Sequence, residues 1–179
     1  MSETLYSKAL SHGHPVKKLF KVKPWGGRLR FDIRDWTDNR PTIKGVSLPS
    51  LRWVSLVYMA PAVADAIKKV KEKGREVNFE LHIGGNVYIT VTSPYWLVDI
   101  RQRFVDSEGN LRPTRRGIKL RFAEWKALTE TFEEVKDAAP EVGVITPCYL
   151  GVDHQNQLGY LSCPECSPKG YSQDTDSTL

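Results

Sequence analysis

The chain has 179 residues, enough for one well-buried domain or two small ones, and its charged fraction of 26% is ordinary for a globular protein. No apolar run reaches the length of a transmembrane helix, and the first residues lack the basic and apolar regions of a secretory signal, so we expect a cytoplasmic protein, or a nuclear one if the source is a eukaryote. All three cysteines lie close to the C-terminus, at Cys148, Cys163 and Cys166, which excludes a disulfide framework for the fold.

The charge is unevenly distributed along the chain. Residues 16–140 carry 24 Lys and Arg against 15 Asp and Glu, whereas residues 141–179 carry one Lys against five acids. A basic body with an acidic tail is typical of a protein that binds a polyanion. The same charge also fits an ordinary solvated surface, so charge alone leaves both interpretations open.

In the first half, apolar alternation predicts strands, and a longer period predicts one helix. Residues 1–15 are expected to form a tail or an edge strand. Three strands are expected, at 19–22, 29–34 and 46–48, with a Gly-rich turn around Trp25 and a break at 38–41. A helix is expected from Pro49 to about residue 73, kinked or restarted at Pro61 and ended by Gly74.

In the second half, the same kinds of pattern predict strands at 79–83, 87–91 and 97–101. Turns are expected at 84–86, at Ser93-Pro94 and at 106–110. A basic loop is then expected at 112–117, a short strand at 118–120 and a helix that opens at Trp125 and ends by Pro140.

The two halves share a series of anchors in the same order. FDIR at 31–34 aligns with VDIR at 98–101 at an offset of 67, and the later anchors align at an offset of 72. These later anchors are Arg40-Pro41-Thr42 with Arg112-Pro113-Thr114, Gly45-Val46-x-Leu48 with Gly117-Ile118-x-Leu120, and Trp53-x-x-Leu56 with Trp125-x-x-Leu128. The change of offset places one five-residue insertion in the turn after the DIR strand. We therefore predict an α+β fold of two tandem ββββα units; one continuous domain with coincidental similarity is the alternative.

The second unit resembles the single-stranded-DNA-binding domain of the transcriptional positive cofactor four family of RNA polymerase II coactivators. The resemblance is carried by Val98-Asp99-Ile100-Arg101, Phe104, Asp106-x-Glu108-Gly109, Pro113-x-Arg115-Arg116-Gly117-Ile118-x-Leu120 and Trp125-x-x-Leu128. It implies strongly curved four-stranded antiparallel sheets, each backed by a helix, that pair through their helices and sheets. With both units in one chain, it implies an intramolecular pseudo-dimer.

The expected boundaries are 1–15 for the tail or edge strand, 16–75 for the first unit, 76–140 for the second and 141–179 for a Cys-containing segment with a disordered tail. The first unit departs from the family pattern. It lacks the DxEG turn and has Ile43 where the second unit has Arg115. The second unit is therefore the better-preserved copy.

Unpaired nucleic acid is held by cations on phosphates and by aromatic rings on bases. In the first unit the residues that fit this chemistry, or that fall at the family's binding positions, are Lys23, Trp25, Arg28, Arg34 and Trp36. In the second unit they are Trp96, Arg101, Phe104, Arg112, Arg115 and Arg116. Because the aromatic of the first turn has no direct counterpart, we expect the two halves to bind unequally. The alternatives are that Trp25 caps the core and that Arg34 and Arg101 pair with neighbouring carboxylates, while Trp53 and Trp125 are expected in the core.

The C-terminal segment carries a candidate metal site. Cys163-x-x-Cys166 has the spacing of a zinc knuckle, and Cys148 and His154 are candidates for the remaining two ligands. Free thiols in a poorly ordered tail and a redox CxxC are the alternatives. No cofactor is required by any other feature of the sequence, and a structural zinc ion is the only one suggested.

The function that these observations favour is non-enzymatic binding of single-stranded or melted DNA in transcription. The transcription machinery is a further expected protein partner, and no membrane is expected. An interaction scaffold of the same fold with a decayed binding face is the alternative, and RNA cannot be separated from DNA by sequence. The sequence has no Gly-rich phosphate loop and no convincing catalytic His or carboxylate cluster, so an enzyme is not expected.

Overall fold

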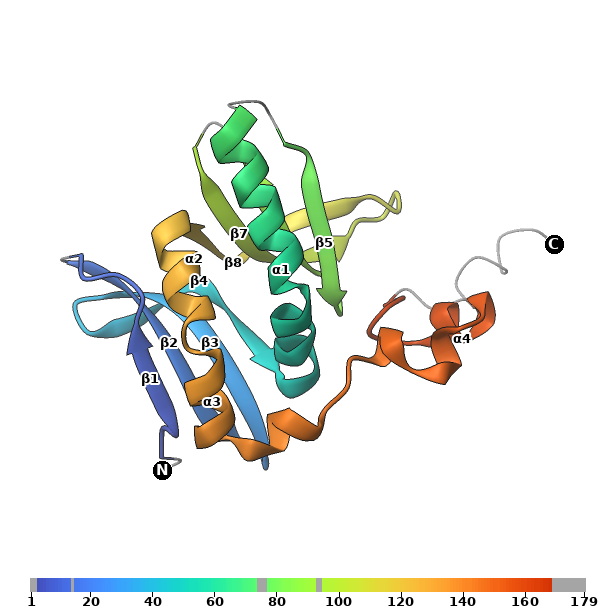
Figure 1. Ribbon diagram of the computed structural model, residues 1–179, viewed down its shortest axis with the longest axis horizontal. Coiled ribbons are helices and arrows are strands. Elements are labelled where there is room, and N and C mark those ends of the chain that lie inside the picture. Colours follow the sequence, from blue (N-terminus) through green and yellow to red (C-terminus); the bar gives the residue numbers. More distant parts are fainter. Residues whose placement is uncertain (1–2, 14, 74–76, 93–94, 169–179) are drawn as a thin grey trace.

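The computed structural model describes residues 3–13, 15–73, 77–92 and 95–168, and they form two four-stranded antiparallel sheets that are each followed by a helix (Figure 1). The first sheet has the order β1-β2-β3-β4 and the second β5-β6-β7-β8. The first unit comprises β1 (Tyr6–Ala9), β2 (Val16–Trp25), β3 (Arg28–Thr37), β4 (Arg40–Pro49) and α1 (Ser50–Lys73). The second unit comprises β5 (Phe79–Gly84), β6 (Val87–Thr92), β7 (Leu97–Val105), β8 (Leu111–Arg121), α2 (Phe122–Thr129) and α3 (Phe132–Ala138).

The first sheet follows the apolar alternation of its sequence. Phe20 and Val22 of β2 face Ile33 and Phe31 of β3 across the ladder, and all four are fully buried. The expected tail or edge strand is β1, which pairs with β2 at the sheet edge. The expected short strand at 46–48 is the end of a ten-residue strand, because the turn before it contains only Asp38-Asn39. Both of these residues have positive φ, which Asp and Asn tolerate better than other side chains.

The basic loop expected at 112–117 is wrong, since these residues belong to the strand β8. The turn before it is closed by Asp106, whose Oδ1 accepts hydrogen bonds from the N–H groups of Glu108 and Asn110 at 2.9 and 2.8 Å. Strand pairing resumes directly after this turn, at Val105 opposite Leu111. Pro113 is compatible with a strand because β8 lies at the edge of its sheet.

The helices differ from the expected ones in two places. α1 is a single helix of 24 residues with Pro61 inside it, so Pro61 does not restart it. The second helix begins at Phe122 rather than Trp125, and it is divided into α2 and α3 at Glu130-Thr131. At the division the buried Thr131 hydroxyl donates to the Leu128 carbonyl at 2.7 Å, a local side-chain bond that competes with the regular helical pattern.

The two units contact each other through strands and helices. The edge strands β4 and β8 are in contact, and α1 packs on β5 of the second unit as well as on β3 and β4 of its own (Figure 1). Trp53, only 1% exposed, stacks against Phe20 and Phe31 and meets Phe132 of α3 edge-on. The buried apolar side chains of both units belong to one hydrophobic cluster, with Trp125 in it as expected.

After the second unit the chain forms short helical pieces. They are the 3-10 turns η1 (Pro140–Val144), η2 (Cys148–Leu150) and η3 (Val152–His154), followed by α4 (Gln157–Ser162). Three expected features lie outside the described residues: the helix stop at Gly74, the turn at Ser93-Pro94 and the tail from Tyr171. Among the helices that are described, none combines the length and the apolar character that crossing a membrane needs.

Candidate nucleic-acid interface

The first sheet has one buried face and one basic face. Residues paired across neighbouring antiparallel strands point to the same side. The face opposite the core therefore carries the cross-strand pairs Trp25–Arg28, Lys23–Arg30, Lys21–Asp32, Leu19–Arg34 and Lys17–Trp36. We call this side the first outer face. Along β2 and β3 it holds six cations, two tryptophans and one carboxylate, so it combines the two kinds of side chain, cations and aromatic rings, that contact unpaired nucleic acid.

The two tryptophans of this face differ in exposure. Trp25 ends β2 with 66% of its surface exposed, and the Arg30 guanidinium lies 5.7 Å from its ring centre. It therefore does not cap the core. Trp36 is half-buried beneath Lys21, whose Nζ lies 4.2 Å from the ring centre. A flat ring flanked by a cation is the arrangement on which a base can stack while its phosphate is neutralised.

Arg34 and Arg101 make the same set of contacts in the two sheets. The Arg34 guanidinium holds both carboxylate oxygens of Asp32 at 2.9 to 3.2 Å, and its Nη1 donates to the Thr42 carbonyl at 2.7 Å. Arg101 holds Asp99 at 3.0 and 3.1 Å and donates to the Thr114 carbonyl at 2.7 Å. Both arginines therefore pair with a neighbouring carboxylate, which was the alternative to direct nucleic-acid contact.

A glycine on the edge strand makes room for each of these arginines. Gly45 lies opposite Arg34 in the ladder and Gly117 lies opposite Arg101. A Cβ on Gly45 would lie 2.8 Å from the Arg34 side chain, and one on Gly117 would lie 2.5 Å from Arg101 Cζ. Both glycines thus leave room for the arginine side chain, and Gly45 also leaves room for the Ile33 carbonyl oxygen, which would lie 2.7 Å from a Cβ.

The corresponding face of the second sheet, which we call the second outer face, carries the cross-strand pairs Tyr88–Arg101, Thr90–Asp99, Asp99–Lys119 and Leu97–Arg121. Arg103 lies over Tyr88, with its guanidinium 4.4 Å from the ring centre, and His82 stacks on the same ring at 4.8 Å. Burial is the largest cause of two pKa shifts here: it raises the pKa of Tyr88 and lowers that of His82. Both shifts favour the neutral forms of the two rings, which lie beside the Arg103 guanidinium.

Positive charge occupies different strands in the two units. When the two sheets are aligned on Asp32 and Asp99, Thr90 and Leu97 occupy the positions of Lys21 and Arg30. At these two positions β6 and β7 therefore have no cation where β2 and β3 have one. The edge strand β8 instead carries Arg112, Arg115, Arg116, Lys119 and Arg121, and β4 carries only Arg40 and Lys44. The two outer faces are consequently unequal in where they could neutralise phosphates.

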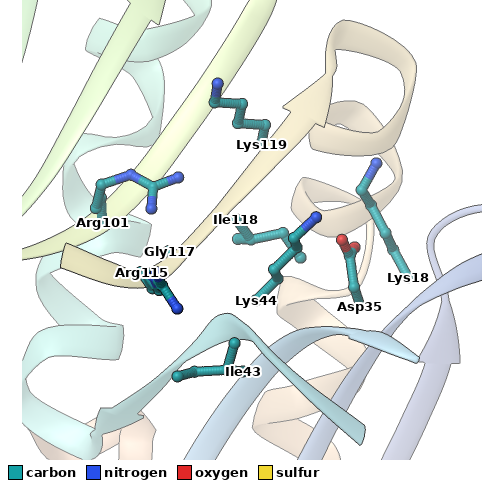
Figure 2. Close-up of a pocket in the computed structure, with 9 residues that line it drawn as sticks. All are labelled: Lys18, Asp35, Ile43, Lys44, Arg101, Arg115, Gly117, Ile118 and Lys119. Carbon is teal, nitrogen blue, oxygen red and sulfur yellow. The ribbon is translucent and has the colours of Figure 1, made fainter. Parts of the chain in front are cut away.

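A basic cavity of about 580 Å³ lies between the units where β4 and β8 meet (Figure 2). Its cations are Lys18, Lys44, Arg101, Arg115 and Lys119. Figure 2 shows Lys18 and Lys44 on either side of the Asp35 carboxylate, the one acidic group among the described residues that line the cavity. Burial raises the pKa of Asp35 above its usual value, although Lys18 and Lys44 lower it, and its Oδ1 has no hydrogen-bond partner among the described residues.

Three of the residues expected in the site lie away from the outer faces. Trp96 stacks on Phe122 of α2, with ring centres 6.0 Å apart. Phe104 and Arg112 are cross-strand partners near the tip of the β7–β8 hairpin, and strand alternation places them on the side opposite Arg103. Arg112 is paired with Asp106 at 2.9 Å, which lowers the pKa of that carboxyl. Of the other second-unit residues, Arg115 and Arg116 are exposed on β8.

Several residues of the outer faces were not predicted from the sequence: Lys21, Tyr88, Arg103 and Lys119. The signal that could have found them is strand alternation, since Lys21 falls two residues before Lys23 and Arg103 falls two residues after Arg101. Tyr88 is the polar-side residue of the apolar alternation in β6. Their pairing across strands, however, depends on register, which the alternation does not provide.

The four candidate metal ligands come together in the C-terminal segment. One ligand atom from each of Cys148, His154, Cys163 and Cys166 lies within 4.8 Å of all the others, so the cluster could hold a metal ion. The sulfur atoms of Cys148 and Cys166 are 3.5 Å apart, and Cys166 Sγ is 3.7 Å from His154 Nδ1. Burial raises the pKa of the Cys163 thiol, but hydrogen bonds from the main-chain N–H groups of Cys166 and Glu165 outweigh it and lower that pKa.

A comparison with protein-family models matches residues 95–131 to the family described as Transcriptional Coactivator p15 (PC4). The matched span contains β7, β8 and α2, including Asp99, Arg101 and Gly117. One family copy is thus matched in the chain, in the unit that the sequence indicated as the better preserved. The structure adds the other four-stranded sheet, β1-β2-β3-β4, in which Arg34 makes the same contacts as Arg101.

Proposed function

We propose that this protein binds single-stranded or locally melted DNA across its two outer faces, as a coactivator of transcription. The observation that carries the proposal is the pairing of an aromatic ring with a cation on each face, Lys21 with Trp36 and Arg103 with Tyr88. Stacking on such rings needs bases that are not already paired, because a duplex hides its base faces. The match of residues 95–131 to a coactivator family supports the same function.

Within this proposal the residues have different roles. Trp25 and Trp36 are the stacking platforms, and Tyr88 holds the Arg103 guanidinium over its ring. Lys23, Arg28, Arg30, Arg103, Arg115 and Lys119 neutralise phosphates. Arg34 and Arg101 keep the outer faces in shape through Asp32 and Asp99, and their remaining exposed edge adds charge. The cavity between β4 and β8 takes phosphates of a strand that passes from one outer face to the other.

The experiment is fluorescence anisotropy of labelled oligonucleotides titrated with the full chain. Single-stranded DNA, its duplex and single-stranded RNA of the same sequence are compared over a salt series. The proposal requires tighter binding of the single strand than of the duplex, and weakening that is linear in the logarithm of salt concentration. Equal affinity for duplex and single strand, or affinity that does not respond to salt, would contradict it. Tighter binding of RNA would reassign the ligand.

We also propose that the two units pair within one chain as an intramolecular pseudo-dimer of curved sheets, with β1 joining the first unit expected at 16–75 and with the second unit at 76–140. Three contacts between them support this: the Lys18–Glu124 ion pair at 3.0 Å, the Tyr6–Glu134 hydrogen bond at 2.6 Å and the Trp53–Phe132 ring contact. Light scattering should then give the mass of one chain, 20.3 kDa. A stable species of twice that mass would favour pairing between chains.

A protein-interaction scaffold is the second candidate function. Ile43 favours it, because this apolar residue is 59% exposed and takes the place of Arg115 at the cavity between the units. If the chain is a scaffold, oligonucleotides of every kind will bind weakly, and Ile43→Arg will not change their affinity. If it binds DNA, the added cation in Ile43→Arg should strengthen binding and steepen the salt dependence.

We further infer that Cys148, His154, Cys163 and Cys166 bind one zinc ion with a structural role. A tetrahedral site with zinc–sulfur bonds of about 2.3 Å has sulfur–sulfur edges of about 3.8 Å, close to the separations of 3.5 and 3.8 Å in the cluster. Four protein ligands would fill such a site and leave no open position for catalysis. One zinc per chain is expected, and Cys166→Ser should abolish it; metal-free protein after expression with zinc would contradict this.

A further inference from the structure

Glu165 hydrogen-bonds the segment that carries the Cys3His cluster to the rest of the described chain. Glu165 lies between Cys163 and Cys166 in the sequence. Its carboxylate accepts two hydrogen bonds from the Arg52 guanidinium of α1, at 2.9 and 3.1 Å. Its main-chain carbonyl accepts the N–H of Gly85, in the turn between β5 and β6, at 2.8 Å. The side chain and the main chain of Glu165 therefore contact two different elements at once.

The β5–β6 turn is shaped to receive this residue. A Cβ on Gly84 would fall on the Glu165 carboxylate, and a Cβ on Gly85 would fall on the Arg52 guanidinium. Both glycines also have positive φ, 122° and 55°, which other residues rarely adopt. Next to this contact a cavity of about 150 Å³ is lined by Cys148, Cys166 and residues of α1 and β5. The contact thus depends on the absence of a side chain at both glycines, which lets the Arg52 guanidinium and the Glu165 carboxylate lie directly against the turn.

The same turn is bonded to the second outer face on its other side. The Gly85 carbonyl accepts from the Gln102 side chain at 2.8 Å, and the Asn86 carbonyl accepts the N–H of Arg103 at 2.8 Å. The Asn86 N–H donates to His82 Nε2 at 3.0 Å, and His82 stacks on Tyr88. Gly85 therefore contacts the Cys3His segment through its N–H and Gln102 of β7, the residue next to Arg103, through its carbonyl.

We propose that the metal-loaded Cys3His segment is a clamp that fixes the β5–β6 turn and so holds Tyr88 and Arg103 in position on the second outer face, with Glu165 as the positioning residue. The inference rests on the proposed zinc and nucleic-acid binding. Zinc ties together four ligands spread along the segment from Cys148 to Cys166, and so fixes the Glu165 main chain. Without the metal, ordering this segment costs conformational entropy at the moment of binding. Zinc removal should therefore weaken nucleic-acid binding without touching any residue of the outer face.

Two measurements on the full chain test the clamp. Hydrogen exchange of residues 82–88 and 102–103 is followed with zinc bound and after its removal by a chelator, and affinity for a single-stranded oligonucleotide is measured in both states. We expect faster exchange in both segments after removal, and a loss of affinity of roughly 2- to 30-fold. Glu165→Gln, which keeps all four ligands, should bind one zinc per chain and show the same changes to a smaller extent. Glu133→Gln, an exposed position on α3, is the matched control and should show neither change.

The possible failures are distinguishable. If the chain binds zinc and oligonucleotide but neither exchange nor affinity responds to zinc removal, the clamp is overturned while both proposed functions stand. If no zinc binds, the zinc proposal and the clamp fail together and DNA binding stands. If exchange responds to zinc but no oligonucleotide binds in either state, the clamp does not serve nucleic-acid binding and the proposed function is wrong.

Discussion

Trp36 and Arg103 occupy equivalent positions in the two sheets, each opposite a proline just beyond the register shift that follows the DIR arginine. One is aromatic and the other cationic, yet each completes a ring–cation pair with the neighbouring strand, Trp36 with Lys21 and Arg103 with Tyr88. The pair is therefore present in both units while its two members have exchanged strands. This relationship is the basis for expecting both outer faces to bind the same class of ligand.

Trp25 should be a stacking platform of the first outer face. Trp25→Ala is expected to reduce the affinity for single-stranded DNA by about 1–3 kcal/mol, because the ring is exposed at the end of β2, where a base could stack on it. Anisotropy titration measures the change. Tyr58→Ala is the matched control, an exposed aromatic on α1; if both variants lose affinity equally, the loss is not specific to the outer face.

Lys23 should neutralise one phosphate. Lys23→Gln is expected to weaken binding to all single-stranded sequences alike and to reduce the slope of log affinity against log salt by about 0.7. Lys68→Gln, at an exposed position near the end of α1, should leave the slope unchanged. An unchanged slope in Lys23→Gln would remove this lysine from the interface.

Arg101 and Arg34 should matter first for stability. In Arg101→Lys the planar guanidinium that joins Asp99 to the Thr114 carbonyl is lost, and the free energy of unfolding should fall by about 1–3 kcal/mol. Arg34→Lys should cost a similar amount, since its contacts are the same. Urea unfolding measures both. Arg112→Lys, in the exposed pair with Asp106, should leave the free energy of unfolding almost unchanged. A loss equal to that of Arg101→Lys would mean that the half-buried position of Arg101 is not the reason for its effect.

Asp35 should make the fold less stable as the pH rises. Its pKa in the folded chain is raised by burial, so the folded state binds more protons than the unfolded state between the ordinary Asp pKa and the raised one. Stability is therefore lost as the pH rises from about 4 through the folded-state pKa. Asp35→Asn should remove this decrease and should be more stable than the original chain at pH 7. Urea unfolding at several pH values decides; a variant less stable at pH 7 would mean that the carboxylate has a partner of its own.

Much of the fold could be predicted from local patterns. The alternation of Phe31 and Ile33, and the aligned FDIR and VDIR segments, indicate the strands and the repeat, because a strand with one buried face must alternate. The length of the strand from Leu111 to Arg121 could not be predicted, since Pro113 and the arginines around it are typical of a loop and the turn chemistry of Asp106 decides where pairing resumes. The division between α2 and α3 depends on one buried Thr131 hydroxyl, which propensities do not reveal.

The kinds of residue in the candidate site could be predicted from the sequence, but their positions relative to one another could not. Aligned basic and aromatic residues indicate the surface, and the four candidate metal ligands of the C-terminal segment do come together. The pairing of Arg103 with Tyr88 depends on strand register, and the contact of Glu165 with Gly85 depends on how segments far apart in the sequence pack. Trp96 was expected among the binding residues because it lies near the β6–β7 turn, but its ring is against Phe122.

DNA binding across the two outer faces is tested most directly by photocross-linking of a thymine oligonucleotide to the full, zinc-loaded chain, with the modified residues identified by mass spectrometry. We predict adducts on β2 and β3 at Trp25 and Trp36 and on the second sheet at Tyr88, with none at the exposed Tyr58 of α1. Adducts concentrated on α1 or on the C-terminal segment, with the outer faces unmodified, would contradict this binding mode.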